Sequence, residues 1–597
     1  MRLSPTPTRW AKRLRFRSKA IKGFRRLSPE EQAQLWLAKP PPGRSHDKKR
    51  RDIINPNLCN EAIDLIQSTN SLPPPGTCDV IDLNPGTSVW SDALHRALKP
   101  RRHVLVEYEK DHYAHAIDPL LHREGSRYRH TKRLLDAFDL NQDLLSDDFR
   151  AYHRNLLPDE RSQARYSRNR QLIITANFSG RAVGYGGYDG PLSKCFMDAF
   201  YYSIASNIGA VQFNDYGLVK LLAWVPEEDK YSIVPRCASF RYRTSKLLEA
   251  SCHIREIVSS FPNREQTTGH SAWHGAALEN CREVAEKQRN AGIEVPEHRR
   301  QPEPEPPSIF YLPVADNFKK LLSLRNQPPL VAQYINFLEK VTTLENEELH
   351  WDEEKKDRLK LRLLKNRMFT THNQYTKTEV IARGFVALER ELISLRRQHP
   401  EDKTPYLDRL KKYQETAAFA ELKTRASLMF KDNRYHVDKA RDDYRVLSHD
   451  PHILAWNNRD FEPLLCQPKK DFLPHHPMTL LEITPKEEFV KRINTSLRWI
   501  CFDYIVREFD LGKKITVQKV LERLIGQPPD SDVYREFLAQ VPSLTDPLYG
   551  GHHDLSDFNA RTLPMDTLID VALAYEKFPF RKDETQMVGT VLGRHTL

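Results

Sequence analysis

Residues 78–113 constrain the fold of this chain more than any other stretch. Their sequence, CDVIDLNPGTSVWSDALHRALKPRRHVLVEYEKDHY, has apolar runs at 79–83 and 103–108, with a turn and a helical pattern at 89–98 between them. The apolar residues of that pattern share one helical face: Val89, Trp90, Ala93, Leu94, Ala97 and Leu98. Two strands joined through a helix lie side by side in parallel, so the stretch predicts a βαβ unit.

The same alternation continues downstream. Strand patterns occur at 171–178, 219–226 and 478–483, and a buried-helix pattern occurs at 193–206. Strands that alternate with helices predict the α/β class with a mostly parallel sheet. After the last strand, Thr484, Pro485 and Glu487 predict a capped helix start.

A long helical segment interrupts this pattern. Residues 297–308 form a Pro/Glu-rich linker, and residues 330–445 have helical periodicity throughout. One stripe in this segment consists of Val380, Ile381, Phe385, Leu388, Leu392 and Leu395. The dense mixed charge around it predicts a solvated face, with a nucleic-acid or partner surface as the alternative.

These patterns divide the chain as follows. We expect a basic leader at 1–45, a Rossmann-like domain at 46–262, and a linker with a helical insertion at 263–460. The last strands of the first domain would lie at 461–484, followed by a C-terminal helical domain at 485–580 and a mobile tail at 581–597.

The net charge of +12 is concentrated at the N-terminus. Residues 1–26 contain ten Lys and Arg and no acid, so only +2 remains for residues 27–597. An Arg-rich, acid-free start is typical of a mitochondrial transit peptide, which predicts the mitochondrial matrix as the location. The alternative is a basic arm that binds nucleic acid.

Cysteine and histidine spacing gives no sign of a metal centre. The eight cysteines are scattered without a C-x-x-C pair, and the pairs His475–His476 and His552–His553 lie beside Pro or Gly. We therefore expect neither a metal site nor a disulfide framework. No run of about 18 apolar residues occurs, so no membrane span is expected.

The βαβ unit carries a candidate cofactor site. Gly86 follows the first strand, and Glu107 ends the second, 21 residues later. In nucleotide-binding βαβ folds such a glycine allows a tight turn under the ligand, and such an acid accepts hydrogen bonds from the ribose.

The order of several motifs resembles one family. DIINPNLCNEAIDLI, VIDLNPGTS, LVEYEKD, LLDAF and IITANFSG resemble successive motifs of the rRNA adenine N6,N6-dimethyltransferases. TANFSG and LLAWVP resemble most closely the mitochondrial transcription factor B branch as found in fungi. The resemblance covers roughly residues 50–262 and 461–525 and implies a Rossmann-like S-adenosylmethionine-dependent methyltransferase fold.

The resemblance implies a set of cofactor-binding positions, which are Ile54, Asn84, Gly86, Glu107, Asp136 and Asn177. Two departures from the family pattern count against catalysis. Asn84 replaces the first glycine of the turn, and Gly180 replaces a tyrosine that would stack on the target base. Asn177 and Phe178 would then be vestiges of the catalytic loop, with Phe178 as an alternative stacking residue.

Three functions are consistent with these residues. The first is a transcription initiation factor that partners the single-subunit mitochondrial RNA polymerase and melts promoter DNA. The second is an S-adenosylmethionine-dependent dimethyltransferase of mitochondrial small-subunit rRNA, and the third is an RNA-binding or ribosome-assembly protein.

The first function needs groups that hold the non-template strand. Its nucleic-acid candidates are Arg181, Tyr185 and Tyr188, with Phe178 and Trp224 nearby. Core packing is the alternative for Trp224, and a plain surface loop is the alternative for the tyrosines. By the same resemblance, the tail from about Lys582 would reach toward the polymerase.

Overall fold

The computed structural model describes residues 50–131, 146–147, 149, 166–180, 191–205, 217–260, 272–302, 351–427, 431–512 and 514–592. The expected leader, Asp136 of the LLDAF motif, and Arg181, Tyr185 and Tyr188 lie outside the described residues.

An eight-stranded sheet forms the centre of the molecule. Its order is β4 (Tyr128–Thr131), β3 (His103–Val106), β2 (Asp79–Leu83), β5 (Arg168–Asn177), β6 (Leu218–Pro226), β10 (Met478–Pro485), β7 (Cys252–Ser259) and β8 (Leu464–Leu465). All pairings are parallel except those of β10, which runs antiparallel to β6 and β7. The α/β class with a mostly parallel sheet is confirmed.

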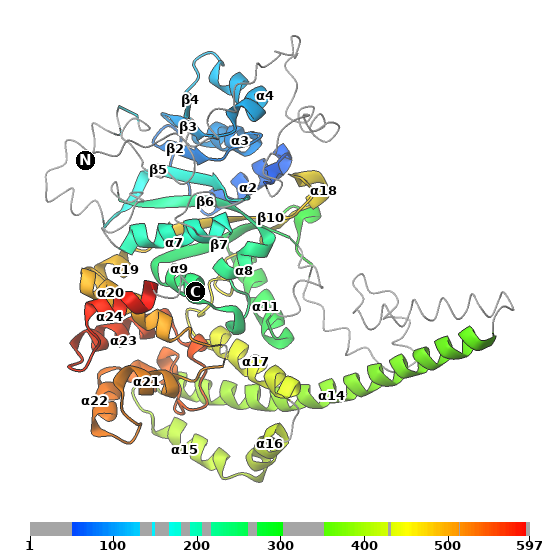
Figure 1. Ribbon diagram of the computed structural model, residues 1–597, viewed down its shortest axis with the longest axis vertical. Helices are drawn as coiled ribbons and strands as arrows, with labels where there is room; N and C mark the ends of the chain where they lie inside the picture. The colour runs from blue at the N-terminus through cyan, green and yellow to red at the C-terminus, as the bar shows by residue number, and fades with distance from the viewer. Residues whose placement is uncertain are drawn as a thin grey trace, which may run out of the picture.

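Helices cover both faces of this sheet (Figure 1). Val80 packs into one apolar cluster with α2 (Pro56–Ser68) and α3 (Val89–Leu98), whereas its neighbour Ile81 packs into another with α7 (Leu192–Ala205) and α9 (Arg243–Ser251). Successive side chains of a strand point to opposite faces. Both faces are buried, which explains why the strands are continuous apolar runs.

The helical segment leaves the sheet after β7 and returns at β8. Its described helices are α11 (His274–Asn290), α14 (Trp351–Gln398), α15 (Thr404–Gln414), α16 (Ala417–Ser427) and α17 (Lys431–Ser448). In the expected stripe Ile381, Phe385, Leu388 and Leu392 are buried. Val380 is 59% exposed, so its place on the stripe was wrong.

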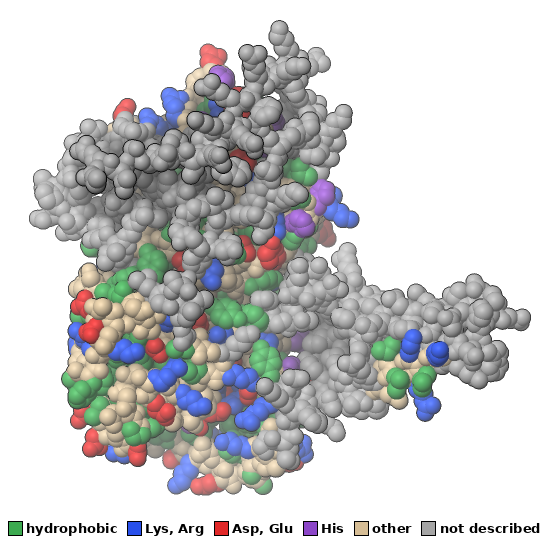
Figure 2. Space-filling view, viewed as in Figure 1, with side chains coloured by type: hydrophobic (Ala, Val, Ile, Leu, Met, Phe, Trp, Pro, Cys, Tyr) green, Lys and Arg blue, Asp and Glu red, His purple; other side chains and the backbone are tan. Residues whose placement is uncertain are grey.

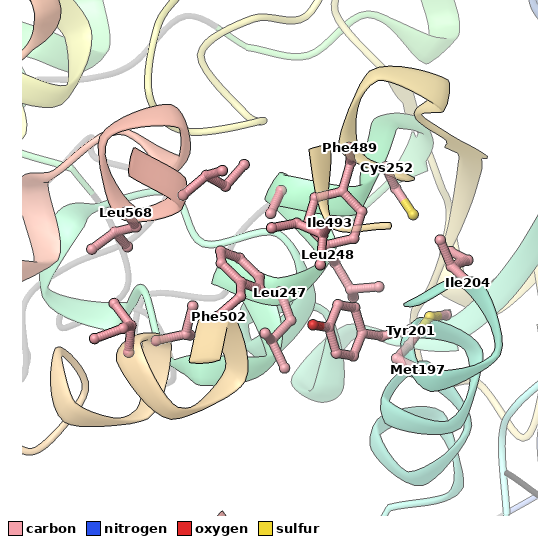
Figure 3. Packing of buried hydrophobic residues seen from close by; sticks show 14 of the residues in the cluster. Met197, Tyr201, Ile204, Leu247, Leu248, Cys252, Phe489, Ile493, Phe502 and Leu568 are labelled. Carbon is pink, nitrogen blue, oxygen red and sulfur yellow. The ribbon is translucent and has the colours of Figure 1, made fainter. Parts of the chain in front are cut away.

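The C-terminal segment is helical and shares a core with α7 and α9. It contains α19 (Glu487–Arg492), α20 (Ser496–Glu508), α21 (Val517–Ile525), α22 (Asp532–Gln540), α23 (Met565–Lys577) and α24 (Glu584–Leu592). Figure 3 shows Phe502 and Leu568 in one apolar cluster with Leu247 and Leu248 of α9. The first domain and the C-terminal helices therefore stabilise each other through a common core.

Two expectations about this segment need correction. Thr484 does not cap a helix, because β10 continues through Pro485 and Thr484 pairs with His253 of β7. The expected mobile tail contains α24, whose Met587 is fully buried 4.0 Å from the sulfur of Cys501. The apolar spacing of Met587 and Val591 is too short to reveal this helix in the sequence.

No helix of the described residues is long and apolar enough to cross a membrane.

Candidate functional site

The candidate site lies at the carboxyl ends of β2, β3 and β5. The chain proceeds from β2 to β3 on one side, whereas β5 pairs with the opposite edge of β2. Such a switch point leaves a crevice in which α/β proteins bind ligands. The turn after β2 and the acid after β3 both lie there.

The sequence-predicted pair Gly86 and Glu107 meets at this crevice. The Gly86 amide donates a hydrogen bond of 3.2 Å to Oε2 of Glu107. Gly86 has a φ of +56° and Asn84 also has a φ of +56°, a region that Asn adopts more readily than most residues. Asn84 thus preserves the turn, and its side-chain amide donates to the Asn177 carbonyl at 3.3 Å.

Arg50 forms an ion pair with the carboxylate of Glu107. Its Nη1 donates to Oε1 at 3.0 Å and its Nη2 donates to Oε2 at 2.5 Å. Both side chains are buried. Two parallel N–H···O bonds are the strongest arrangement that an arginine and a carboxylate form. Both oxygens that would receive ribose hydroxyls are therefore used within the chain.

Asp52 fills the space above Gly86. A Cβ at Gly86 would lie 2.3 Å from Oδ1 of Asp52, so only glycine allows this approach. The Tyr113 hydroxyl, on α4 (Lys110–Leu121), donates to Oδ2 of Asp52 at 3.1 Å. The Arg50 guanidinium lies over the Tyr113 ring, 4.5 Å from its centroid. We call Arg50, Asp52, Glu107 and Tyr113 the plug.

The electrostatics of the plug keep Arg50 charged. Burial acts to lower the pKa of Arg50, but the adjacent negative charge of Glu107 outweighs it and holds the pKa above its ordinary value. Burial also raises the pKa of Tyr113, which keeps its hydroxyl protonated as a donor. The plug is thus a buried ion pair with hydrogen-bonded neighbours.

A short pairing of two strands holds the segment that contains Arg50 and Asp52 in place. β1 (Asp52–Ile53) pairs antiparallel with β9 (Phe472–Leu473). Ile54, expected near the cofactor entry, is buried and its amide donates to the carbonyl of Asp471 at 2.9 Å. The Thr87 hydroxyl donates to the Ile53 carbonyl at 2.5 Å. The segment is therefore bound both to the turn after β2 and to β9.

The Asn177 side chain is also committed. Its Nδ2 donates to the Arg51 carbonyl at 2.8 Å, and its Oδ1 accepts from the amide and the hydroxyl of Ser179 at 3.0 and 2.7 Å. An amide group that bound an adenine amine would need this oxygen as an acceptor. In this arrangement the Asn177 oxygen already accepts hydrogen bonds from Ser179 in the same loop.

The aromatic candidates near the loop belong to the core. Phe178 is fully buried, with its ring centroid 4.1 Å from that of Phe196. Trp224 is fully buried and packs edge-on against Trp90 at 5.6 Å, which confirms core packing for this residue. Neither ring face is open to a base. Arg181, Tyr185 and Tyr188 lie outside the described residues, so their roles stay predictions.

The residues present do not fit S-adenosylmethionine in this arrangement. Its ribose would need Glu107, which binds Arg50, and its close approach to the turn would need the space that Asp52 takes. Among the described residues, no group of three or more His, Cys, Asp and Glu could hold a metal ion.

Sequence reasoning missed the plug. Arg50 stands 57 residues from Glu107 and within a basic run at 48–51, just after the expected leader. The only local signal was an acid, Asp52, directly after this basic run. That signal does not identify the partner, because the contact forms only when the sheet is assembled.

Comparison with known proteins gives little further information. No protein-family model matches the chain, and no curated protein matches it. Among solved structures, the crystal structure of a dimethyladenosine transferase from Plasmodium falciparum is similar at 13% identity and a TM-score of 0.21. The match covers 53% of this chain and 98% of that one.

Proposed function

We propose that this chain is a mitochondrial transcription initiation factor. It would act in the matrix with the single-subunit mitochondrial RNA polymerase and help to recognise and melt promoter DNA. Its scaffold would be a Rossmann-like methyltransferase-type domain with a C-terminal helical domain and a helical insertion. In this proposal the scaffold binds nucleic acid without S-adenosylmethionine.

One observation carries the proposal: both carboxylate oxygens of Glu107 accept hydrogen bonds from Arg50. A methyltransferase needs that carboxylate for its cofactor, whereas a protein that only binds nucleic acid does not. The bidentate pair is buried and is reinforced by the Gly86 and Glu109 amides, at 3.2 and 2.9 Å. The plug therefore supports a role in which the fold serves as a scaffold.

The loop after β5 supports the same conclusion. A base methylase must hold the target amine with acceptors and stack the base on an aromatic face. The Asn177 oxygen is used by Ser179, the Phe178 ring is buried, and Gly180 has no side chain. None of these residues offers what the reaction requires.

The second candidate is the rRNA adenine dimethyltransferase. The observation that favours it is the contact between Gly86 and Glu107, which brings turn and acid together as a nucleotide site requires. This function would require Arg50 to leave Glu107 when S-adenosylmethionine binds. Arg50 and Glu107 are thus the residues that separate the two candidates.

Run-off transcription tests the proposal. The cognate polymerase would be assayed on a duplex promoter and on the same promoter with the start region already melted, with and without this protein lacking residues 1–45. We expect strong stimulation on the duplex template and little on the melted one. Equal transcript yields with and without the protein on both templates would contradict the proposal.

A parallel methylation assay tests the second candidate. Small-subunit rRNA and labelled S-adenosylmethionine would be incubated with the same protein. We expect no transfer of label to adenine. Transfer together with no stimulation of transcription would replace the proposed function with the enzyme.

A further inference from the structure

The N-terminal part of α14 is a surface separate from the candidate site. Residues 355–367 read KKDRLKLRLLKNR, with seven Lys and Arg residues and a single acid, Asp357, and they follow three acids in the first turn of the same helix, Asp352, Glu353 and Glu354. Figure 1 shows this end of α14 projecting away from the rest of the described structure. We call residues 356–366 the arm.

The single helix α14 has two parts with different environments. From Thr378 onward its inward side chains are buried, and Ile381, Phe385 and Leu392 pack into apolar clusters with α15 and α17. Between Lys356 and Thr378 lie roughly 33 Å of helix, at about 1.5 Å per residue. The C-terminal part thus fixes the helix to the body, and the arm extends from it.

Most of the described side chains of the arm are open to solvent, and Leu364 is half-buried. The exposed basic residues are Lys356, Arg358, Lys360 and Arg362. Leu359 and Leu363 are also exposed, by 56% and 58%. In Figure 2 the described part of the arm, at the right, shows blue Lys and Arg side chains beside green apolar ones. A surface of this kind attracts a polyanion.

The angular distribution of charge favours nucleic acid over a lipid bilayer. At about 100° per residue, Arg358 and Arg362 lie on one side of the Leu359–Leu363 stripe, and Lys356 and Lys360 lie on the other. The stripe between them is narrow, whereas a helix that lies in a bilayer needs a wide apolar face. Phosphates on both sides of the helix match this distribution better.

We propose that the arm binds the phosphate backbone of a DNA duplex. Each Lys or Arg that contacts a phosphate releases condensed counterions, which makes the affinity depend on salt. Phosphate contacts position a protein on DNA without reading its sequence. The arm would therefore add sequence-independent affinity for duplex DNA, whether or not the chain acts at promoters.

Fluorescence anisotropy with a labelled DNA duplex over a series of salt concentrations tests this proposal. It would use the full chain, so that residues 1–49 contribute equally to every variant. The arm variant combines Lys356→Gln, Arg358→Gln, Lys360→Gln and Arg362→Gln. A matched control makes the same charge change at four other exposed lysines: Lys411→Gln, Lys412→Gln, Lys469→Gln and Lys470→Gln.

We expect the arm variant to lower the slope of log affinity against log salt by roughly 2 to 4, since each lost phosphate contact removes about 0.9. The control should keep the slope of the unsubstituted chain. Equal slopes for the arm variant and the control would overturn the proposal, as would no duplex binding by the unsubstituted chain at low salt.

Sedimentation with phosphatidylserine vesicles tests the alternative that the arm binds a lipid bilayer instead of a DNA duplex. We expect Leu359→Ser with Leu363→Ser to leave duplex affinity nearly unchanged, because these side chains do not carry the charge. Vesicle binding that is lost in the arm variant, while duplex affinity is retained, would assign the arm to a membrane surface and overturn the proposal.

Discussion

The guanidinium of Arg50 and the carboxylate of Glu107 are joined by two hydrogen bonds of 3.0 and 2.5 Å at the carboxyl end of β3. The pair is buried, and it stands where the geometry of the sheet would place a nucleotide. A retained turn and a retained acid therefore coexist with a side chain that excludes the ligand. The protein therefore keeps the fold but not the open cofactor site that such folds usually have.

Breaking this pair from one side should destabilise the protein. Arg50→Ala leaves the Glu107 charge buried without its partner, which costs roughly 3–5 kcal/mol. Arg50→Met combined with Glu107→Gln removes both charges and should recover most of that loss. The midpoint of thermal unfolding measures both effects.

A surface pair provides the control for that experiment. Arg96 forms an ion pair with Asp92 at 3.5 Å, and its side chain is largely exposed. Arg96→Ala should cost no more than about 1 kcal/mol. An Arg50→Ala midpoint no lower than that of Arg96→Ala would show that the buried pair does not stabilise the fold.

Asp442 of α17 should make stability depend on pH. Burial raises its pKa to about 7, although the positive charge of Arg445 acts in the opposite direction. The unfolded value is about 3.9, so the stability from this group is complete below about pH 4 and is lost as pH rises to about 7. Asp442→Asn stays neutral and keeps the contact with Asn559, whose side-chain amide lies 2.8 Å away.

The stability of Asp442→Asn relative to the unsubstituted chain should therefore rise between about pH 4 and about pH 7, by on the order of a few kcal/mol. Unfolding midpoints of both proteins across this range measure the difference. Curves that run parallel over the whole range would show that Asp442 does not titrate there.

The last helix should contribute to the core. Met587 of α24 is fully buried against α20, so Met587→Ala should cost roughly 2–5 kcal/mol through the cavity it leaves. Thr585 on the same helix is exposed, and Thr585→Ala should change stability by less than about 0.5 kcal/mol. Equal unfolding midpoints for the two variants would mean that α24 does not pack on α20 in solution.

Much of the sheet could be predicted because its signals are local. The apolar runs at 79–83 and 219–226 and the helix at 89–98 correspond closely to β2, β6 and α3. Buried parallel strands and amphipathic helices have periods that a short window reveals. The pairing of turn and acid followed from the same βαβ spacing.

The rest depends on contacts between distant segments. The interaction of Arg50 with Glu107 and the course of β10 through Pro485 are set by partners that only the assembled fold brings close. Val380 fits the helical stripe by spacing alone, but no element among the described residues covers its position and it is 59% exposed. Local periodicity cannot show which positions tertiary contacts reach.

Tyr185 and Tyr188 should matter for promoter melting if the proposed function holds. Tyr185→Ala with Tyr188→Ala removes two aromatic faces on which separated bases could stack, each worth about 1–3 kcal/mol. Run-off transcription should fall on a duplex promoter much more than on a pre-melted one. An equal loss on both templates would exclude a melting role for these tyrosines.

Equilibrium dialysis with labelled S-adenosylmethionine tests whether Arg50 closes the cofactor site. The full chain should retain no label above a bovine albumin control. Arg50→Ser, which removes the two guanidinium hydrogen bonds to Glu107, should show a measurable gain in binding. Saturable binding to the unsubstituted chain, with no gain in Arg50→Ser, would show that Arg50 does not close the site and would favour the methyltransferase function.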